Sequence, residues 1–401
     1  MRDTTDILIS GGGIAGLAAA CAFGAAGFRV ICVEPDPPVT EARATGSDLR
    51  TTAFLHPSIP VLEAAGLWAR LAPHAAALQI MRIVDAGGPV AEPRVIKDFN
   101  AADLSDKPFG WNLPNWLLRR EMLARMAELP DVTFLPGLAT TAVLTRSTEA
   151  LVTLSDGRRI AARLLIGADG RGSVVRQALG IKVRTLRYGQ KALAFATSHP
   201  IPHDNVSTEI HRSGGPFTFV PLPDRDGRPC SAVVWMDHAA EVDRRLTLPV
   251  AEFEAEMMDR SCGLLGPLKL ESRLTAWPII AQIAERMAGE RTALMAEAAH
   301  VMPPIGAQGL NMSLADLTAL LDLAMADRAG LGSPAMLQAY HRKRHLDVQT
   351  RVMGIDLLNR ASQIGAQPLR DMRATALDAL YSVAPLRRGL MRAGIGVREG
   401  G

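Results

Sequence analysis

The sequence predicts an α/β fold with a discontinuous first domain, an inserted β-sheet domain and a C-terminal helical region. Three features predict it: a buried strand, glycine-rich turn and helix at the N-terminus, a strand-rich stretch near the middle, and a helical stretch after Pro334. The chain has 401 residues, more than the roughly 250–300 at which a single hydrophobic core stops growing. We therefore expect more than one domain.

Composition excludes several functional classes. Hydrophobic residues make up 48% of the chain and charged residues 21%, which is typical of a globular protein. The net charge of +3 is too balanced to indicate a nucleic-acid partner. The four cysteines (Cys21, Cys32, Cys230 and Cys262) lack metal-ligand or redox spacing, so we expect no metal site and a reducing compartment.

The apolar run from Ile7 to Val33 invites comparison with a signal peptide or a membrane span. Asp3 and Asp6 are unsuited to a positively charged leader, and glycines cluster at the start of the run. A buried strand–helix–strand unit explains the same residues better. We expect a cytoplasmic protein.

The first motif is the turn that follows the strand Asp6–Ser10, with the sequence Gly11-Gly-Gly13-Ile14-Ala15-Gly16. Gly11 permits the tight turn, Gly13 lets the backbone approach a pyrophosphate, and Gly16 lets helix and strand pack closely. The helix that follows directs free N–H groups and the positive end of its dipole toward the phosphates.

Glu34 ends the predicted second strand, close to the ~20-residue spacing of the acid that binds a ribose hydroxyl. Together these features predict a Rossmann-like dinucleotide site. An acid at this position favours FAD or NAD over NADP.

Two further segments complete the pattern. Arg163–Gly170 reads as a strand that ends in Asp169-Gly170, with Ser173 as a candidate helix N-cap. Leu294–Asn311 reads as a strand, a loop rich in proline and glycine, and a helix that starts near Asn311. Gly306 and Gly309 permit positive φ, so successive N–H groups of this loop can form a nest for an anion.

With these three motifs in this order, the chain resembles the class A FAD-dependent aromatic hydroxylases over roughly residues 5–325. The segments Asp48–Ala53, Phe217–Leu222 and Val234-Trp235 are similar to the ubiquinone-biosynthesis branch of that family. One departure is Ala296-Glu297, where the family has Gly-Asp.

The resemblance implies a role for each motif residue. Glu34 is expected to bind the adenosine ribose, and Arg50 and Arg120 the pyrophosphate, with Arg119 nearly as good a candidate. The remaining cofactor-binding candidates are Gly11, Gly13, Ile14, Ala15, Gly16, Asp169, Gly170, Glu297, Gly306, Gly309, Leu310 and Asn311. The carbonyl of Pro304 is the family position beside flavin C4a.

The implied chemistry is hydroxylation of a prenylated phenol in ubiquinone biosynthesis by O₂, through a flavin C4a-hydroperoxide. The cofactor carries this chemistry. His300 is a candidate catalytic base, although a structural, hydrogen-bonded histidine is the preferred interpretation. His341 and His345 lack a third ligand and indicate a basic helix face. No second dinucleotide fingerprint occurs, so NAD(P)H or another electron donor is expected to bind transiently.

The predicted domains are an FAD-binding domain over 1–180 and 280–325, a β-rich substrate domain over 181–279, and a helical region over 326–401. In the last region Lys and Arg outnumber Asp and Glu. Either an ordinary helical cap or a peripheral contact with the inner face of the membrane explains this. Contact with other ubiquinone-biosynthesis proteins also stays open.

Three alternatives remain at the level of sequence. The enzyme could hydroxylate a soluble phenol or a specialised metabolite. An NAD-dependent Rossmann dehydrogenase explains the first 34 residues but not the Pro303–Asn311 loop. A non-catalytic flavin-binding protein leaves that loop equally unexplained. A flavin halogenase is disfavoured because no W-x-W-x-I-P sequence occurs.

Overall fold

The N-terminal strand, turn and helix form where the sequence predicts them. In this computed structural model, which describes residues 3–396, β1 (Asp3–Ser10) leads into α1 (Ile14–Ala25), and β2 (Val30–Glu34) follows. β1 and β2 pair in parallel, and Ile7, Leu8 and Ile9 are fully buried. The apolar run near the N-terminus is therefore a core strand–helix–strand unit, as predicted.

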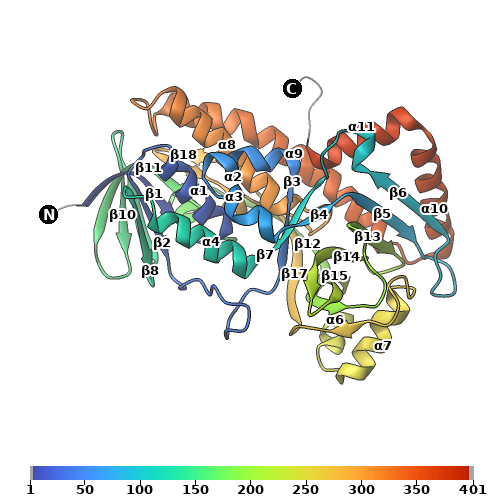
Figure 1. The fold of residues 1–401 in the computed structure, drawn as a ribbon. Coiled ribbons are helices and arrows are strands. Elements are labelled where there is room, and N and C mark those ends of the chain that lie inside the picture. The colour runs from blue at the N-terminus through green and yellow to red at the C-terminus, as the bar shows by residue number, and fades with distance from the viewer. Residues whose placement is uncertain (1–2, 397–401) are drawn as a thin grey trace.

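The first sheet has eight strands in the order β18-β19-β11-β1-β2-β8, with β10 paired to β11 and β9 paired to β10 (Figure 1). The pairs β1–β11, β1–β2, β2–β8 and β11–β19 are parallel, so the carboxyl ends of these strands share one edge. The other strands are β8 (Val132–Pro136), β9 (Thr140–Thr145), β10 (Ala150–Leu154), β11 (Arg159–Gly167), β18 (Ala288–Gly289) and β19 (Thr292–Leu294).

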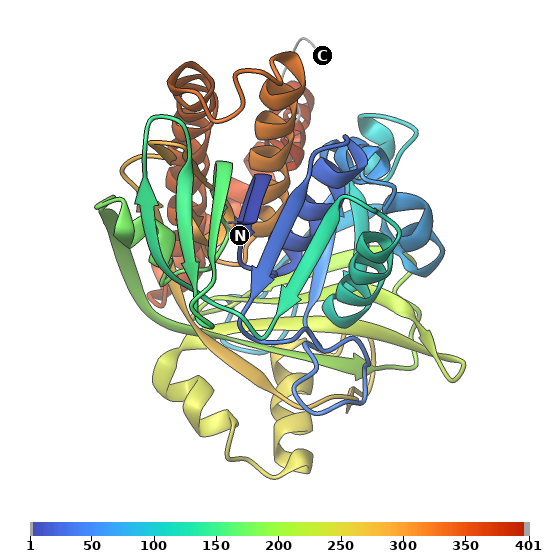
Figure 2. The same ribbon diagram turned by 90° about the vertical axis from the view of Figure 1, so that its left-hand side faces the viewer.

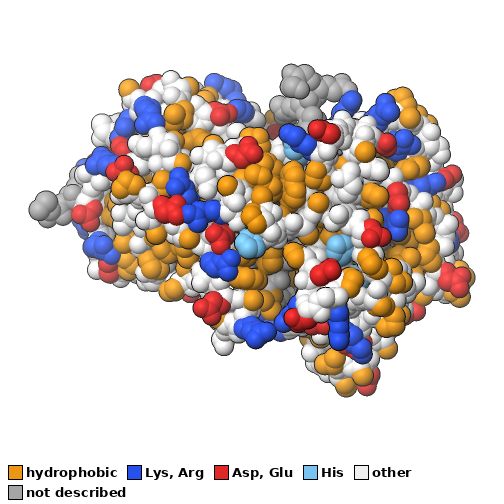
Figure 3. Space-filling view, in the orientation of Figure 1, with side chains coloured by type: hydrophobic (Ala, Val, Ile, Leu, Met, Phe, Trp, Pro, Cys, Tyr) orange, Lys and Arg blue, Asp and Glu red, His pale blue; other side chains and the backbone are white. Residues whose placement is uncertain are grey.

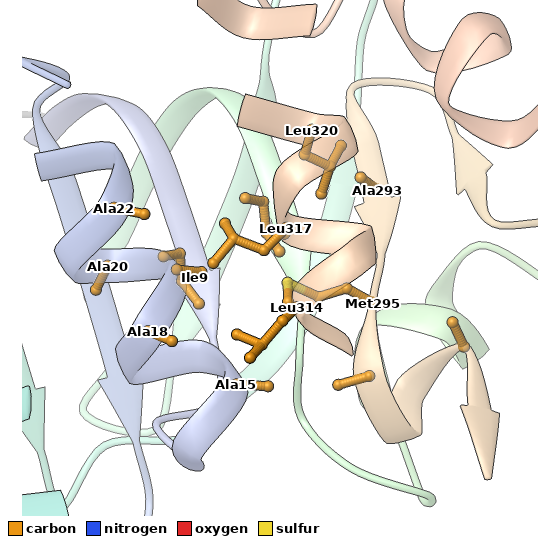
Figure 4. Packing of buried hydrophobic residues seen from close by; sticks show 14 of the residues in the cluster. Ile9, Ala15, Ala18, Ala20, Ala22, Ala293, Met295, Leu314, Leu317 and Leu320 are labelled. Carbon is orange, nitrogen blue, oxygen red and sulfur yellow. The ribbon is translucent and has the colours of Figure 1, made fainter. Parts of the chain in front are cut away.

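Helix α1 packs between this sheet and two other helices, α4 (Asn115–Ala127) and α8 (Gln308–Ala326). Small side chains on α1 allow the close approach. Leu314 and Leu317 of α8 point toward Ile9 and the alanines of α1 (Figure 4). Each buried leucine contributes roughly 1.5–3 kcal/mol of transfer free energy.

The second sheet has nine strands in the order β20-β17-β12-β15-β14-β13-β5-β6, with β16 beside β12. Its strands are β5 (Ile80–Asp85), β6 (Val95–Asn100), β12 (Val183–Ser198), β13 (Val206–His211), β14 (Pro216–Arg225), β15 (Arg228–His238), β16 (Lys269–Leu270), β17 (Thr275–Ala284) and β20 (His300–Val301). The strand-rich middle is thus confirmed, with longer strands than the sequence indicated. Asp226 and Gly227 form the predicted turn, with φ of 52° and 73°, as a tight hairpin requires.

The strand pairing differs from the predicted domain ranges. β5 and β6 lie within 1–180, yet β5 pairs in parallel with β13. β17 also crosses the predicted boundary at 279. We therefore propose that the second domain includes β5, β6 and all of β17. A pairing between strands so far apart in the chain has no local sequence signal.

Helices α6 (Ala239–Arg245) and α7 (Val250–Arg260) cover one face of the second sheet. Phe217, Trp235 and Phe253 form the core beneath them. Figure 2 shows these helices in yellow below the sheet and the first domain above it. We call the face opposite α6 and α7 the front face.

A small third sheet, β3-β7-β4, joins the two domains. Asn112 Nδ2 on β7 donates a hydrogen bond of 2.9 Å to the Pro221 carbonyl on β14. The strands of this sheet are β3 (Thr51–Leu55), β4 (Ala76–Leu78) and β7 (Gly110–Pro114). The short helices of the two domains are α2 (Ile59–Ala64), α3 (Trp68–Leu71), α5 (Val174–Ala178), η1 (His56–Ser58), η2 (Ala72–His74), η3 (Ala101–Asp103) and η4 (Ala296–Ala298).

The C-terminal part is helical, as predicted: α9 (Pro334–Gln363), α10 (Gln367–Ser382) and α11 (Ala384–Ile395). α9 packs beside α8, and its Tyr340 hydroxyl donates a hydrogen bond to the Leu294 carbonyl at 2.7 Å. α10 lies along β6 (Figure 1). Within residues 3–396, no helix combines the length and the apolar character needed to cross a bilayer.

Candidate cofactor and active site

The glycine turn between β1 and α1 has the geometry that the sequence predicts. Gly11 has φ of 105°, and a Cβ there would lie 2.4 Å from the Ala168 carbonyl oxygen. At Gly16 a Cβ would lie 1.9 Å from the Gly11 oxygen, so both positions exclude a side chain. Gly13, in contrast, has no atom within 4 Å of its Cβ position and caps α1 without a side-chain hydrogen bond. Ile14 and Ala15 begin the helix, whose first N–H groups are therefore available to an anion.

Glu34 reaches back to this turn from the end of β2. Its Oε2 accepts a hydrogen bond of 2.5 Å from the Gly12 N–H, and its Oε1 one of 3.2 Å from the Asp36 N–H. The carboxylate therefore lies beside the glycine turn, at the carboxyl edge of the first sheet.

Asp169 lies in the loop after β11, directly beside the glycine turn. The Ala168 N–H donates to the Ser10 carbonyl at 2.8 Å. The Asp169 side chain stabilises its own loop and the start of α5. Its Oδ1 accepts a hydrogen bond from Ser173 Oγ at 2.5 Å, and its Oδ2 accepts one from the Val175 N–H at 3.1 Å. Ser173 caps α5, as predicted. Gly170 has φ of 80° and open space at its Cβ position.

The third motif meets the first two at the same edge. The Met295 N–H, which follows β19, donates to the Gly167 carbonyl at 3.0 Å. Glu297 lies in η4, where its Oε2 is 3.6 Å from Arg171 Nε and its side chain is mostly exposed. The loops after β1, β11 and β19 therefore converge, although they lie far apart in the chain.

The loop 303–307 and the start of α8 differ in one detail from the prediction. Gly306 and Ala307 both have positive φ, 63° and 55°, and α8 begins at Gln308 rather than near Asn311. Leu310 thus lies in the first turn, whose N–H groups lack partners within the helix. Gly309 has open space at its Cβ position. Pro304 lies in the loop that leads to this turn.

The Asn311 side chain anchors the start of α8 to β3. Its Oδ1 accepts from the Leu55 N–H and from Ser58 Oγ, each at 2.8 Å. Its Nδ2 donates to the carbonyls of Ala53 at 2.8 Å and Ala307 at 2.6 Å. All four hydrogen-bonding positions of the amide are satisfied, so its side chain has a structural task that the motif did not reveal.

Two arginines meet one carboxylate in the segment before β3. Arg50 binds Asp48 through two hydrogen bonds of 2.8 Å, and Arg119 Nη2 lies 3.5 Å from the same carboxylate. Burial alone would raise the pKa of Asp48, but Arg50 and its other partners hold it below its ordinary value.

Arg119 and Arg120 take different directions from α4. Arg119 Nε is buried and has no hydrogen-bond partner within residues 3–396. Arg120 instead contacts Glu121 and the Trp116 ring, and its side chain is 44% exposed. The geometry favours Arg119 over the predicted Arg120 as a ligand of a phosphate.

His300 lies in a buried ion-pair network. Its Nε2 is 2.6 Å from Asp316 Oδ2, and Arg344 Nε donates to Asp316 Oδ1 at 2.7 Å. The side chains of all three are almost completely buried. This geometry favours the structural interpretation of His300 over a catalytic one. His341 Nδ1 accepts from the Met287 N–H at 3.2 Å, so this histidine also has a packing task.

These features fit a dinucleotide cofactor. Gly13, Gly170 and Gly309 leave open space at the three converging loops, and a buried Arg119 donor lacks a partner in the described part of the chain. The family comparison decides which cofactor: the profile of the "FAD binding domain" family matches residues 4–354.

The chain belongs to this FAD-binding family. It is similar to the ubiquinone hydroxylase UbiL of Rhodospirillum rubrum, with 33% identity over 98% of this chain and 89% of the relative. It is also similar to the 3-demethoxyubiquinol 3-hydroxylase of Escherichia coli, with 27% identity over 98% of this chain and 99% of that protein.

Solved structures confirm the fold. The p-nitrophenol 4-monooxygenase PnpA of Pseudomonas putida superposes with a TM-score of 0.81 and 18% identity, over 100% of both chains. PqsL of Pseudomonas aeruginosa superposes with a TM-score of 0.76 and 24% identity, over 94% of this chain and 100% of that one. The predicted class of FAD-dependent monooxygenase is confirmed, and the NAD-dependent dehydrogenase is not supported.

Two features of the site had no clear signal in the sequence. Asp48, which joins Arg50 to Arg119, begins the family-like segment Asp48–Ala53, but the resemblance gave its side chain no role. Gln308 donates through Nε2 to the carbonyls of Gly306 at 2.9 Å and Gly394 at 2.7 Å, which connects the loop to α11. A contact with the last helix could not be read from the local sequence.

Proposed function

We propose that this monooxygenase hydroxylates the aromatic ring of a prenylated phenol in ubiquinone biosynthesis. The observation that carries the proposal is the similarity over nearly the whole chain to two proteins named as a ubiquinone hydroxylase and a 3-demethoxyubiquinol 3-hydroxylase. The front face of the second sheet supports it, because small and apolar side chains such as Ala194, Ala232 and Val234 line it.

The proposed FAD contacts follow from the geometry. Glu34 would hold the adenosine ribose, while Arg50, Arg119 and the first turn of α1 would hold the pyrophosphate. Asp169 and Glu297 would lie along the middle of the cofactor, and the first turn of α8, at Leu310, would face the isoalloxazine. Helix N-termini stabilise negative charge, which suits a reduced flavin.

When bound and reduced, FAD activates O₂ so that one oxygen atom enters the ring. The protein residues supply position and exclusion of water. Pro303 and Met302 are buried on either side of the loop start, and Asn311 holds the loop's end against β3. NAD(P)H or another donor would bind transiently. The structure has no second dinucleotide turn within residues 3–396.

The function is tested with purified FAD-loaded protein, a short prenylated phenol such as 2-geranylphenol, and a reductant under ¹⁸O₂. We expect one ¹⁸O atom in the ring of the product. A strain that lacks the gene should accumulate a quinone precursor with one hydroxyl group fewer, and the wild-type gene should remove it. Unlabelled product, or an unchanged quinone profile, would contradict the proposal.

The C-terminal helices carry features of a peripheral membrane contact, which we include in the proposal. Leu346, Met353 and Leu357 lie on one face of α9 and are each about 70% exposed. Exposed apolar side chains continue on α10 and α11: Leu369, Met372, Leu380, Leu386 and Leu390. Figure 3 shows hydrophobic side chains with basic ones between them at the right-hand side of the molecule, over α10 and α11. Such a surface suits an anionic bilayer and a lipid-soluble substrate.

The membrane contact is tested by sedimentation of the full chain with vesicles of phosphatidylglycerol and phosphatidylcholine. We expect Met353→Asp with Leu357→Asp to reduce binding about tenfold without loss of FAD. The matched control is Leu144→Asp on β9, an exposed apolar residue on another part of the surface. Equal sedimentation of all three proteins would reject the contact.

A further inference from the structure

Glu209 and His211 form a close carboxylate–imidazole pair away from the residues assigned to FAD. Glu209 Oε1 and His211 Nε2 are 2.7 Å apart, and their side chains are 17% and 16% exposed. They stand two residues apart on β13, so both point to the same face of the sheet. Buried ionisable pairs outside a structural core are candidates for function.

The pair faces away from α6 and α7. Ile210, between the two residues, packs with Phe217 and Trp235 in the core beneath those helices. Because side chains alternate along a strand, Glu209 and His211 point to the front face.

The front face is directed toward the first domain, which contains the loop that the FAD proposal places beside the flavin. Ala192 on β12 and Met236 on β15 pair with each other and face the front. Both belong to the same hydrophobic cluster as Met302 and Ile305, which flank the loop around Pro304. The front face of this sheet therefore packs toward the first domain, which carries that loop.

Glu209 stands among uncharged neighbours in its own row of the sheet. It pairs with Thr218 on β14 and with Ile83 on β5, and Thr218 pairs with Val234 on β15. Thr218, Ile83 and Val234 are only partly buried, so the surface over this row is accessible.

The second oxygen of the carboxylate is available. Within residues 3–396, the Glu209 side chain contacts His211 through Oε1, and its Oε2 has no hydrogen-bond donor. His211 Nδ1 is also buried without a partner in this part of the chain. Among the described residues, the Glu209 carboxylate is therefore the one polar group in contact with the ring.

Other charged groups near the pair are already occupied. Asp85, in the next strand, binds Arg94 at 2.6 Å and Arg373 at 2.8 Å. Lys97, on β6, binds Asp378 at 2.6 Å and lies over the Tyr381 ring. The Arg373 guanidinium also donates to the carbonyls of His211 and Arg212. Both oxygens of the Asp85 carboxylate are therefore engaged by arginines, and Lys97 and Arg373 are paired with carboxylates. Asp85 leaves no free acceptor for a ligand on the front face.

We propose that Glu209 accepts the hydrogen bond of the substrate's phenolic hydroxyl and that His211 positions the carboxylate. This inference rests on the proposed function. As the ring reacts, the proton moves from the phenol oxygen toward Glu209 Oε2, and the electron pair left on oxygen increases the electron density of the ring. No other bond changes in this step. Glu209 is then a catalytic residue and His211 a positioning residue.

The test compares wild type with Glu209→Gln, as full-length FAD-loaded proteins, on 2-geranylphenol and on its methyl ether. We expect kcat/KM for the phenol to fall about 100-fold at neutral pH, as for loss of a positioned proton acceptor. Flavin absorbance titrations should show that wild type prefers the phenol to the ether and that the variant does not. Near pH 10, where a phenol ionises in solution, activity of the variant should recover relative to wild type.

His211→Asn is expected to give a smaller loss, about tenfold, with the same recovery at high pH. The matched control is Glu254→Gln on α7, which removes a carboxylate paired with Lys269 on the other side of the sheet, and it should behave as wild type. A Glu209→Gln protein with unchanged kcat/KM and unchanged preference for the phenol overturns the inference alone. Wild type that does not hydroxylate the phenol overturns the proposed function as well, so the two failures are distinguishable.

Discussion

The backbone of Ala296 is strained. Its φ is 53°, a left-handed conformation that costs a non-glycine residue about 1–2 kcal/mol. The family pattern has glycine before the acid at this position, and the structure explains why: the chain must turn sharply between β19 and η4. Glu297 keeps the carboxylate of the pattern, so the departure affects the turn more than the charge.

Ala296→Gly should therefore stabilise the protein. Relief of the strained φ outweighs the extra freedom of glycine in the unfolded chain, about 0.4–1 kcal/mol, for a net gain of about 0.5–1 kcal/mol. The measurement is urea unfolding of the FAD-free protein. Ala298→Gly is the control, because Ala298 is not among the residues with positive φ and should lose stability. A lower midpoint for Ala296→Gly would contradict the argument.

Asn311 shows how far a residue's task can lie from its motif. The sequence places it correctly in the loop and helix of the third motif, beside Leu310. Its hydrogen bonds to Leu55 and Ala53, however, join residues more than 250 positions apart in the chain. Only the folded chain brings these partners together, so no local pattern could predict them.

At the scale of elements, helix α4 directs its two neighbouring arginines to different surroundings. Consecutive residues on a helix point about 100° apart, so Arg119 and Arg120 cannot serve the same site. The sequence left both open and preferred Arg120. The structure turns Arg119 toward Asp48 and Arg50 and leaves Arg120 on the surface.

Arg119→Ala is expected to raise the dissociation constant of FAD about 10- to 100-fold, since a hydrogen bond to a charged group contributes roughly 1.5–3 kcal/mol. Arg120→Ala is the matched control and should change it little. Quenching of flavin fluorescence during titration of the FAD-free protein measures both. A larger effect at Arg120 would restore the original sequence prediction.

The position at which α8 begins also differs from the prediction. The sequence placed it near Asn311, after the last glycine of the loop. Because Ala307 already adopts the left-handed conformation that ends the loop, the helix begins at Gln308. The earlier start brings Gln308 to the carbonyl of Gly394 on α11, so the loop and the C-terminal helix are held together.

At the scale of the whole molecule, one buried carboxylate links three elements. Asp316 on α8 binds His300 on β20 and Arg344 on α9. Burial alone would raise the pKa of Asp316, but His300 and Arg344 outweigh it and hold the pKa below its ordinary value. A depressed pKa contributes stability that is present above the ordinary value of the unfolded chain and is lost as the pH falls through the folded one.

The free energy of unfolding should therefore decrease as the pH falls below about 4. Asp316→Asn should lose about 3–5 kcal/mol at neutral pH, because it removes one of the two carboxylates that pair with the buried Arg344 and the carboxylate that pairs with His300. The variant should also show less of the acid-dependent loss. Urea unfolding at several pH values measures both. Asp322→Asn, an exposed residue of α8 paired with Lys343, is the control. Equal stability of the two variants would contradict the prediction.

The domains are also a property of the whole molecule. The sequence predicted the order of the first domain, the strand-rich insertion and the helical end. It did not predict that β5 and β6 join the second sheet, because strand pairing over such distances depends on which edges the folded chain leaves free. The proposed second domain therefore draws on two separate parts of the chain.

The sequence by itself determined the α/β class, the glycine turn, the acid Glu34 at the end of the second strand, and the family. Each of these is recognised from short motifs of residues that lie close together in the chain. Turn geometry, helix starts and the alternation of apolar side chains are local properties, and local sequence records them. The tertiary structure alone decided that Arg119 lies inward, that Asn311 holds β3, and that Glu209 and His211 lie on the front face of the second sheet. These depend on packing between distant segments, where burial and hydrogen bonding are settled only after the chain has folded.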